Sequence, residues 1–414
     1  MRRRLPSISL LFLILIFPSL VMAQISQSVV VLDQVEILDE TDLGIEGVVI
    51  SPDGESVIAY GSDSSIFIID PNAPKNYSRV EAFGSISLLD ASFHPGGRTV
   101  LLVGQGGAAL RIVVANHSVE SAGGASIFGE TDLTAISWNS DGSWAYVGGE
   151  EGWIWKYRGL DDGRVEAAPL DNRGTSDISS ISCLRESNVC IVLTAFDGIG
   201  IINQEHELSW IGGFNHPWVD VECKSISSFE CVAVSSDLAI ARINVNTVDP
   251  SETMIHDNDI VQLLGIQGVM TGIYPHWEGN SLISMAPFGL IEYNSDEGKA
   301  LHWLDNSEVV DFDVLISGER VVGTWATGYF EGWVVTDKGS VVSFGPIVSE
   351  SSGSILEIWV GVIILGGTAL MILSLVSSSS PRFSRWITKR IGSEEEKKSA
   401  IREERRISRK RGRA

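Results

Sequence analysis

The chain has 414 residues and a net charge of −23 at pH 7. The charge is divided unevenly: residues 24–354 carry fourteen Lys and Arg against forty-seven Asp and Glu, whereas residues 382–414 carry thirteen against five. The length allows two ordinary domains or one large β-domain. The acidic excess excludes nucleic acid as a partner of residues 24–354 and favours a salty medium, a cationic partner or divalent cations.

The N-terminus has the pattern of a secretory signal peptide. Three arginines at residues 2–4 precede an apolar run at residues 8–17, and small or apolar residues precede Gln24. An uncleaved anchor is the alternative, but the run is shorter than the roughly 20 apolar residues that a membrane-spanning helix needs. We therefore predict a signal peptide at residues 1–23.

Four segments between residues 47 and 202 repeat one pattern: a strand, a tight polar turn, an apolar strand that ends in small residues, and a third strand. The first unit reads Gly47-Val-Val-Ile-Ser-Pro-Asp-Gly54, followed by an apolar strand and by Ile66-Phe-Ile-Ile-Asp70. Asp-Gly between alternating apolar runs is a strong hairpin signal. Three fainter units follow, and the last is expected to place its first strand at Val309–Ile316.

The first turns of the seven units centre near residues 53, 96, 141, 186, 228, 278 and 318. A period in the low forties with four short strands per unit is typical of a β-propeller blade. A pair of β-sandwiches is the alternative, but sandwiches do not repeat in this way. We predict an all-β, seven-bladed β-propeller over residues 24–346. Its blades are expected near residues 45–83, 89–127, 133–170, 177–212, 218–263, 269–304 and 308–346.

A propeller must join its two ends within one blade. Val29–Ile37 is an alternating strand ahead of the first unit, so residues 28–37 are expected to close the ring as the outermost strand of the last blade. Ser340–Phe344 competes for the same place.

The repeat resembles WD40 and YVTN-type propeller repeats. Ser-Pro-Asp-Gly, an apolar strand, Gly-Ser-Asp and Ile-x-Ile-Asp carry the resemblance, which covers roughly residues 24–346 and is clearest in the first four units. Asp63 and Asp197 match the turn aspartate between the second and third strands, and Glu151 and Asp237 match it loosely. The Gly-His and Trp-Asp signatures are largely absent, so the resemblance implies a divergent propeller without transferable ligand sites.

The four cysteines lie in the fourth and fifth units. Cys183 faces Cys190 across one hairpin turn, and Cys223 faces Cys231 across the next. An even number of cysteines outside the cell indicates disulfides, so we predict these two pairs. Bridges between the two blades and a zinc site are the alternatives, although the Cys-x2-Cys spacing of common zinc sites is missing.

Asn76 and Asn116 begin glycosylation sequons in predicted loops.

The loops that lead into the first strands of the blades are rich in acids. Because such loops converge on one face of a propeller, they could form an acidic ring that holds a divalent cation or a basic peptide. Surface solvation is the plainer interpretation, and no Asp-x-Asp-x-Asp-Gly calcium loop is present. The residues of this candidate ring are Asp39, Glu40, Asp42, Glu130, Asp132, Asp171, Asp177, Asp305 and Glu308.

No catalytic motif stands out. The seven histidines form no His-x-His or His-Glu-x-x-His pattern, and neither a Gly-x-Ser-x-Gly motif nor a P-loop is present. His216 and His276 precede Trp or Pro-Trp in loops, where each could line a pocket or serve as an ordinary loop residue. We therefore predict no catalytic residues and no cofactor beyond the possible cation.

The C-terminal part has the pattern of a membrane anchor. Residues 355–376 are apolar apart from Glu357 and long enough to span a bilayer, after a short stalk at residues 347–354. The basic tail at residues 377–414 places the C-terminus in the cytoplasm by the positive-inside rule. The tail is expected to be helical and to contact anionic lipid through Arg382, Arg385, Trp386, Lys389 and Arg390.

The sequence therefore predicts a single-pass protein of the cell membrane with an acidic propeller outside. We expect a binding or scaffolding module for an extracellular protein or ligand, possibly a basic one. A propeller enzyme of the lactonase or hydrolase kind, with a cation at the central channel, is one alternative. A receptor that signals through the basic tail is another.

Overall fold

The computed structural model describes residues 28–39, 42–82, 84–160, 164–224, 229–347, 364–365, 367–368, 371 and 380–411. The chain divides into two compact units, Met1–Ile347 and Val348–Ala414. The predicted signal peptide, most of the stalk and most of the apolar segment 355–376 lie outside the described residues. Among the residues that are described, no helix is both long enough and apolar enough to span a membrane.

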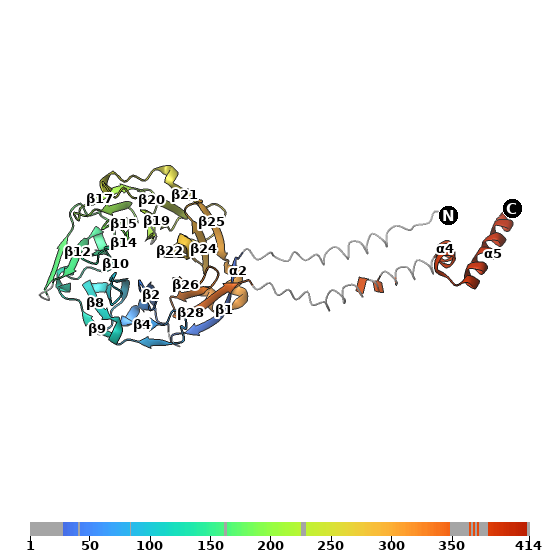
Figure 1. Ribbon diagram of the computed structural model, residues 1–414, viewed down its shortest axis with the longest axis horizontal. Helices are drawn as coiled ribbons and strands as arrows, with labels where there is room; N and C mark the ends of the chain where they lie inside the picture. The colour runs from blue at the N-terminus through green and yellow to red at the C-terminus, as the bar shows by residue number, and fades with distance from the viewer. Residues whose placement is uncertain are drawn as a thin grey trace. The chain divides into compact units, whose positions relative to one another are not determined.

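The first unit is a ring of seven four-stranded antiparallel sheets (Figure 1). This confirms the all-β, seven-bladed propeller predicted from the repeat. The strands of the first three blades are β2 Ile45–Ile50, β3 Val57–Gly61, β4 Ile66–Ile69 and β5 Tyr77–Arg79; β6 Leu88–Phe93, β7 Thr99–Gly104, β8 Ala108–Val113 and β9 Ser118–Ser121; and β10 Leu133–Trp138, β11 Ala145–Gly149, β12 Ile154–Gly159 and β13 Val165–Pro169.

The next three blades follow the same order. Their strands are β14 Ile178–Cys183, β15 Cys190–Thr194, β16 Ile199–Ile202 and β17 Leu208–Gly212; β18 Trp218–Cys223, β19 Glu230–Ser235, β20 Ala239–Asn244 and β21 Ile260–Gln262; and β22 Val269–Pro275, β23 Ser281–Ala286, β24 Gly289–Asn294 and β25 Lys299–Leu304.

The seventh blade joins the two ends of the ring. It contains β26 Val321–Ala326, β27 Gly332–Thr336, β28 Ser340–Pro346 and, outermost, β1 Val30–Ile37. β1 runs antiparallel to β28, with Val30 opposite Pro346 and Ile37 opposite Ser340. The N-terminal strand therefore takes the outer position, and Ser340–Pro346 is the third strand inside it.

The prediction of a strand at Val309–Ile316 is wrong. A short helix, α2 Asn306–Phe312, occupies this segment, and a 3-10 turn at Ile316–Gly318 follows it. The Asp305 side chain caps the helix by accepting a hydrogen bond from the Ser307 N–H at 2.9 Å. Because β1 supplies the outer strand, the blade needs only three strands after the helix, and Val309 packs into the core instead.

The first strands of the blades contact one another in sequence around the centre of the ring. Each of them is bulged near its start, between its first and third residues or, in β22, between its second and fourth. The residues directly after the bulge, blade by blade, are Gly47, Asp90, Ala135, Ser180, Asp220, Gly272 and Gly323. A bulge that recurs seven times at one position is a feature of the ring and not of a single blade.

The hydrophobic core is divided into seven clusters, each shared by two neighbouring blades. Two disulfides lie within this frame, Cys183–Cys190 and Cys223–Cys231. They are the two hairpin pairs predicted from the sequence, not bridges between blades, because each pair lies directly opposite in its hairpin register.

The second unit contains two described helices, α4 Pro381–Ile391 and α5 Glu394–Arg411. The Arg390 guanidinium lies over the Trp386 ring at 5.2 Å, and Trp386 stacks on Phe383. Lys389 forms an ion pair with Glu404 on α5. Trp386 is exposed on α4.

Candidate binding surface

The turns and loops of the propeller are divided between two opposite faces, here named the exit face and the distal face. The exit face carries the turns between first and second strands and the loops between third and fourth strands. The described chain enters it at Val30 and leaves it beside Pro346, which is paired with Val30. The distal face carries the turns between second and third strands and the loops that join blades. These are residues 62–65, 105–107, 150–153, 195–198, 236–238, 287–288 and 337–339, and residues 38–39, 42–44, 80–82, 84–87, 122–132, 170–177, 213–217, 263–268 and 305–320.

The described acids of the candidate ring lie on the distal face, and several of them are bound locally. Asp132 accepts a hydrogen bond from Gly106 N–H at 2.7 Å, and Asp177 accepts one from Glu151 N–H at 2.9 Å. Each of these two bonds ties a blade-joining loop to a turn of the preceding blade. Asp39 pairs with Arg79 at 3.0 Å.

The remaining members of the ring do not converge either. Asp42 accepts a hydrogen bond from the Gly44 N–H, and Asp305 caps α2. Glu130 and Asp171 are exposed and Glu308 is half-buried, whereas Glu40 lies outside the described residues. Within the described part of the chain, no three Asp, Glu, His or Cys residues are grouped so that they could hold a metal ion. The divalent cation stays a prediction without an assembled ligand set.

The turn aspartates that carry the family resemblance link turns to blade-joining loops through their side-chain contacts. Asp197 accepts hydrogen bonds from the backbone N–H and the hydroxyl of both Thr175 and Ser176, at 2.7–2.8 Å. Burial raises the pKa of Asp197, but these bonds outweigh it and hold the pKa below its usual value. Asp237 pairs with His216 at 2.9 Å. His216 is therefore held by a contact between a blade-joining loop and a turn of the distal face.

His276 is enclosed on the exit face. Its side chain packs against Trp303, with ring centroids 5.0 Å apart, and against Tyr329 at 5.5 Å. Burial lowers the pKa of His276 to about 4, so the ring is neutral at pH 7. It is a core residue of the blade 6–7 boundary.

Three carboxyls near the centre of the ring have the perturbed pKa values that often mark active sites. Burial raises the pKa of Asp90 and of Glu222 to about 7, and it also raises the pKa of Asp220. Asp90 accepts the Ile136 N–H of the next blade at 2.7 Å, and Asp220 accepts the Ile273 N–H at 2.9 Å. These two aspartates stand at the same bulged position, and each links its own blade to the next through this hydrogen bond, here named a clasp. Their burial therefore has a structural reason.

The distal face over blades 6 and 7 is apolar as well as acidic. Val310, Phe312, Val314 and Leu315, here named the apolar ridge, are exposed on α2 and the segment after it, Val314 by 69% and Leu315 by 80%. Glu308, Asp311 and Asp313 alternate with them in the sequence. Exposed large apolar side chains that are rimmed by charge are a feature of protein-binding surfaces.

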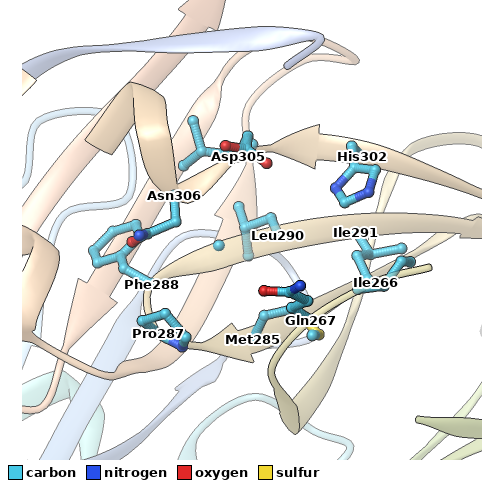
Figure 2. A pocket seen from close by; sticks show the side chains of 12 residues that line it. Ile266, Gln267, Met285, Pro287, Phe288, Leu290, Ile291, His302, Asp305 and Asn306 are labelled. Carbon is cyan, nitrogen blue, oxygen red and sulfur yellow. The ribbon is translucent and has the colours of Figure 1, made fainter. Parts of the chain in front are cut away.

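A small pocket of about 60 Å³ adjoins the start of α2 (Figure 2). Figure 2 shows Gln267 and Ile266 on one side, Asp305 and Asn306 on another, and Leu290 between them. The Oδ1 atom of Asn306 is buried without a hydrogen-bond partner among the described residues. The pocket has room for a few water molecules or the end of one side chain.

Both predicted sequons are on the exit face and exposed. Asn76 lies between β4 and β5, and Asn116 lies between β8 and β9. The Asn116 side-chain oxygen accepts hydrogen bonds from the Ser118 N–H at 3.3 Å and the Ser118 hydroxyl at 2.8 Å. Their occupancy stays a prediction.

No known protein family matches the chain, and no curated protein does. Solved structures do match. The β-propeller domain of Cps50 (Swd1) from Myceliophteria thermophila aligns with a TM-score of 0.57 and 10% identity, over 75% of this chain and 99% of that domain. The chain therefore has the fold of a divergent WD40-like β-propeller.

Proposed function

We propose that this protein is a membrane-anchored, extracytoplasmic propeller that binds a protein partner through its distal face and is not an enzyme. The observation that carries the proposal is the apolar ridge, a set of exposed apolar side chains between carboxylates on the segment that joins blades 6 and 7. A rigid ring with variable loops suits a scaffold for recognition.

The compartment is supported by the two disulfides, since such bonds persist outside the reducing cytosol. Together with the predicted signal peptide and the basic tail, they favour a propeller outside and a tail inside. On the tail, Arg385, Lys389 and Arg390 stand beside the exposed Trp386 on one short helix. We assign this helix to the surface of anionic lipid.

The chemistry of the ridge indicates the kind of partner. Apolar side chains that alternate with carboxylates suit a partner segment with an apolar centre and basic flanks. The negative charge of residues 24–354 would speed the approach of such a segment at low salt. The same charge argues against nucleic acid.

The test compares the full-length protein with two variants in its own membrane. Val314→Asp with Leu315→Asp places charge on the ridge, whereas Val248→Asp, at a residue that is 95% exposed on the exit face, is the matched control. Proteins that copurify with the wild type and the control but not with the ridge variant are the expected partners. If all three retain the same proteins, the distal face is not the binding surface.

Topology is tested separately. A cysteine placed at Ser408 should react with an impermeant maleimide only after the cells are opened, whereas one placed at Val248 should react in intact cells. The opposite pattern would overturn the proposed orientation.

A further inference from the structure

A cleft of about 900 Å³ opens between blades 2 and 3. Its walls come from the turns at residues 94–98 and 142–143, from β8 and β9, and from residues 157–160 and 164–165 of blade 3. This volume lies within the range of sites that hold small molecules, about 300–1,000 Å³.

The cleft is basic in an acidic unit. Among the described residues, four arginines line it, Arg98, Arg111, Arg158 and Arg164, together with a single carboxylate, Glu120. Residues 24–354 contain only fourteen Lys and Arg in total against forty-seven acids. Cations needed only for solubility would be spread over the surface, so their concentration at one boundary between blades needs another reason.

Arg111 and Arg158 are held in place by ion pairs yet keep donors available. Arg111 gives one hydrogen bond to Glu120 at 2.8 Å and is 51% exposed. Arg158 directs Nε and one terminal nitrogen to a single oxygen of Glu166, and its guanidinium lies 4.2 Å from the Trp144 ring centroid. Since a guanidinium has five N–H donors, each keeps unused ones. Exposed Arg98 has no side-chain partner in the described chain.

The walls are also joined across the blade boundary. His94 Nδ1 accepts the Gly96 N–H at 3.0 Å, which leaves Nε2 to donate to the Gly142 carbonyl at 3.2 Å. The Tyr157 hydroxyl donates to the Gly123 carbonyl at 2.6 Å. These bonds fix both ends of the cleft, so the site is formed before any ligand arrives and little ordering cost is expected on binding.

We propose that this cleft binds a ligand that carries phosphate groups. A phosphate offers oxygens in several directions and up to two charges, so two or more guanidiniums can contact it together, and arginine recognises it through paired N–H donors. The turns at residues 94–98 and 142–143 belong to the exit face. The phosphate could therefore come from a lipid headgroup or from a soluble phosphate ester, and the inference does not depend on the partner proposed for the distal face.

The test uses the full-length protein in neutral detergent. Inositol hexakisphosphate is the soluble probe, and phosphatidylcholine vesicles with and without phosphatidylglycerol are the lipid probe. Arg98→Ser with Arg111→Ser removes two charges from the cleft. The matched control, Lys299→Ser with Lys338→Ser, removes two exposed charges elsewhere in the propeller. The basic tail is the same in every variant, so the difference between the variants reports the cleft.

The cleft variant is expected to bind the soluble probe about tenfold more weakly than the control, because it loses charge-assisted hydrogen bonds. A matching loss on phosphatidylglycerol vesicles assigns the site to a headgroup, and a loss with the soluble probe alone assigns it to a soluble ester. Equal binding of both probes by the cleft variant and the control overturns the proposal. If the double variant fails to fold, Arg98→Ser alone keeps the test, since that side chain supports no neighbour.

Discussion

Two boundaries between neighbouring blades have the same hydrogen bond at the centre of the ring and differ farther out. One lies between blades 2 and 3, and the other lies between blades 5 and 6. At the centre, Asp90 and Asp220 clasp the next blade from the same bulged position. Farther out, the second boundary is closed, since the Ser281 hydroxyl donates to Glu222 at 2.6 Å and Arg242 donates to the Ser295 carbonyl at 3.0 Å. The first boundary opens into the arginine cleft. The ring therefore needs the inner clasp, whereas the outer part of a boundary is free to become a site.

The largest effects are expected at the clasps. Asp220→Ala leaves the Ile273 and Val221 N–H groups and the Ser180 hydroxyl without their acceptor. Because each buried donor without a partner costs about 1–3 kcal/mol, we expect a loss of at least about 3 kcal/mol in unfolding free energy. Asp90→Ala should cost a similar amount, measured by urea unfolding of the propeller.

Glu297→Ala, at an exposed ion pair, is the control and should change stability by less than about 1 kcal/mol. If Asp90→Ala behaves like this control while Asp220→Ala does not, the two boundaries are not equivalent at the centre and the comparison fails.

Loss of the Cys223–Cys231 disulfide should affect the boundary between blades 5 and 6 and leave the boundary between blades 2 and 3 unchanged. Cys223–Cys231 adjoins Glu222 at the closed boundary and closes a loop with a sequence separation of 8, so Cys223→Ser with Cys231→Ser should cost about 2.5 kcal/mol by chain entropy. Hydrogen exchange of the double variant should increase in β18 and β19. Faster exchange in β8 and β12 as well would show that the two boundaries unfold together.

The sequence predicted the ring because blade turns recur locally. Asp-Gly turns, apolar runs and the cysteine spacing all depend on neighbours in the chain. The clasps were missed because Asp90 and Ile136 are 46 residues apart and meet only when bulged strands line the centre of the ring. The apolar residues of Val309–Ile316 fall at a repeat position and so predict a strand there, although Asp305 and Glu308 are suited to the N-terminus of the helix that the segment forms.

The site was predicted less well than the fold. The many acids of the sequence predict an acidic ring, yet carboxylates such as Asp132 and Asp177 accept hydrogen bonds that link a loop to a turn of the preceding blade. The arginine cleft had a signal in the sequence, since five of the fourteen basic residues of residues 24–354 lie within residues 98–164. Their convergence needs side chains from two blades, which periodicity alone does not bring together.

A smaller effect should appear in the pH dependence of stability. The folded-state pKa of Asp90 is about 7, above its ordinary value of 3.8, so between these pH values the folded protein holds a proton that the unfolded chain has released. Unfolding free energy must therefore fall as pH rises through this window. Asp90→Asn cannot titrate and should show a shallower fall between pH 5 and pH 8, measured by thermal unfolding. Glu222→Gln should do the same at the closed boundary, since the pKa of Glu222 is also about 7.

The smallest stability effect separates a binding cleft from an incidental ion pair. Glu120→Gln removes the only carboxylate among the described residues that line the cleft and releases Arg111, and Glu297→Gln releases Lys299 from another exposed pair. Both should change unfolding free energy by less than about 1 kcal/mol, because exposed ion pairs contribute little. Only Glu120→Gln should tighten binding of inositol hexakisphosphate, by about threefold, since one negative charge a few ångströms from the ligand is removed. An unchanged or weaker affinity would mean that Arg111 serves its own strand pair and not a ligand.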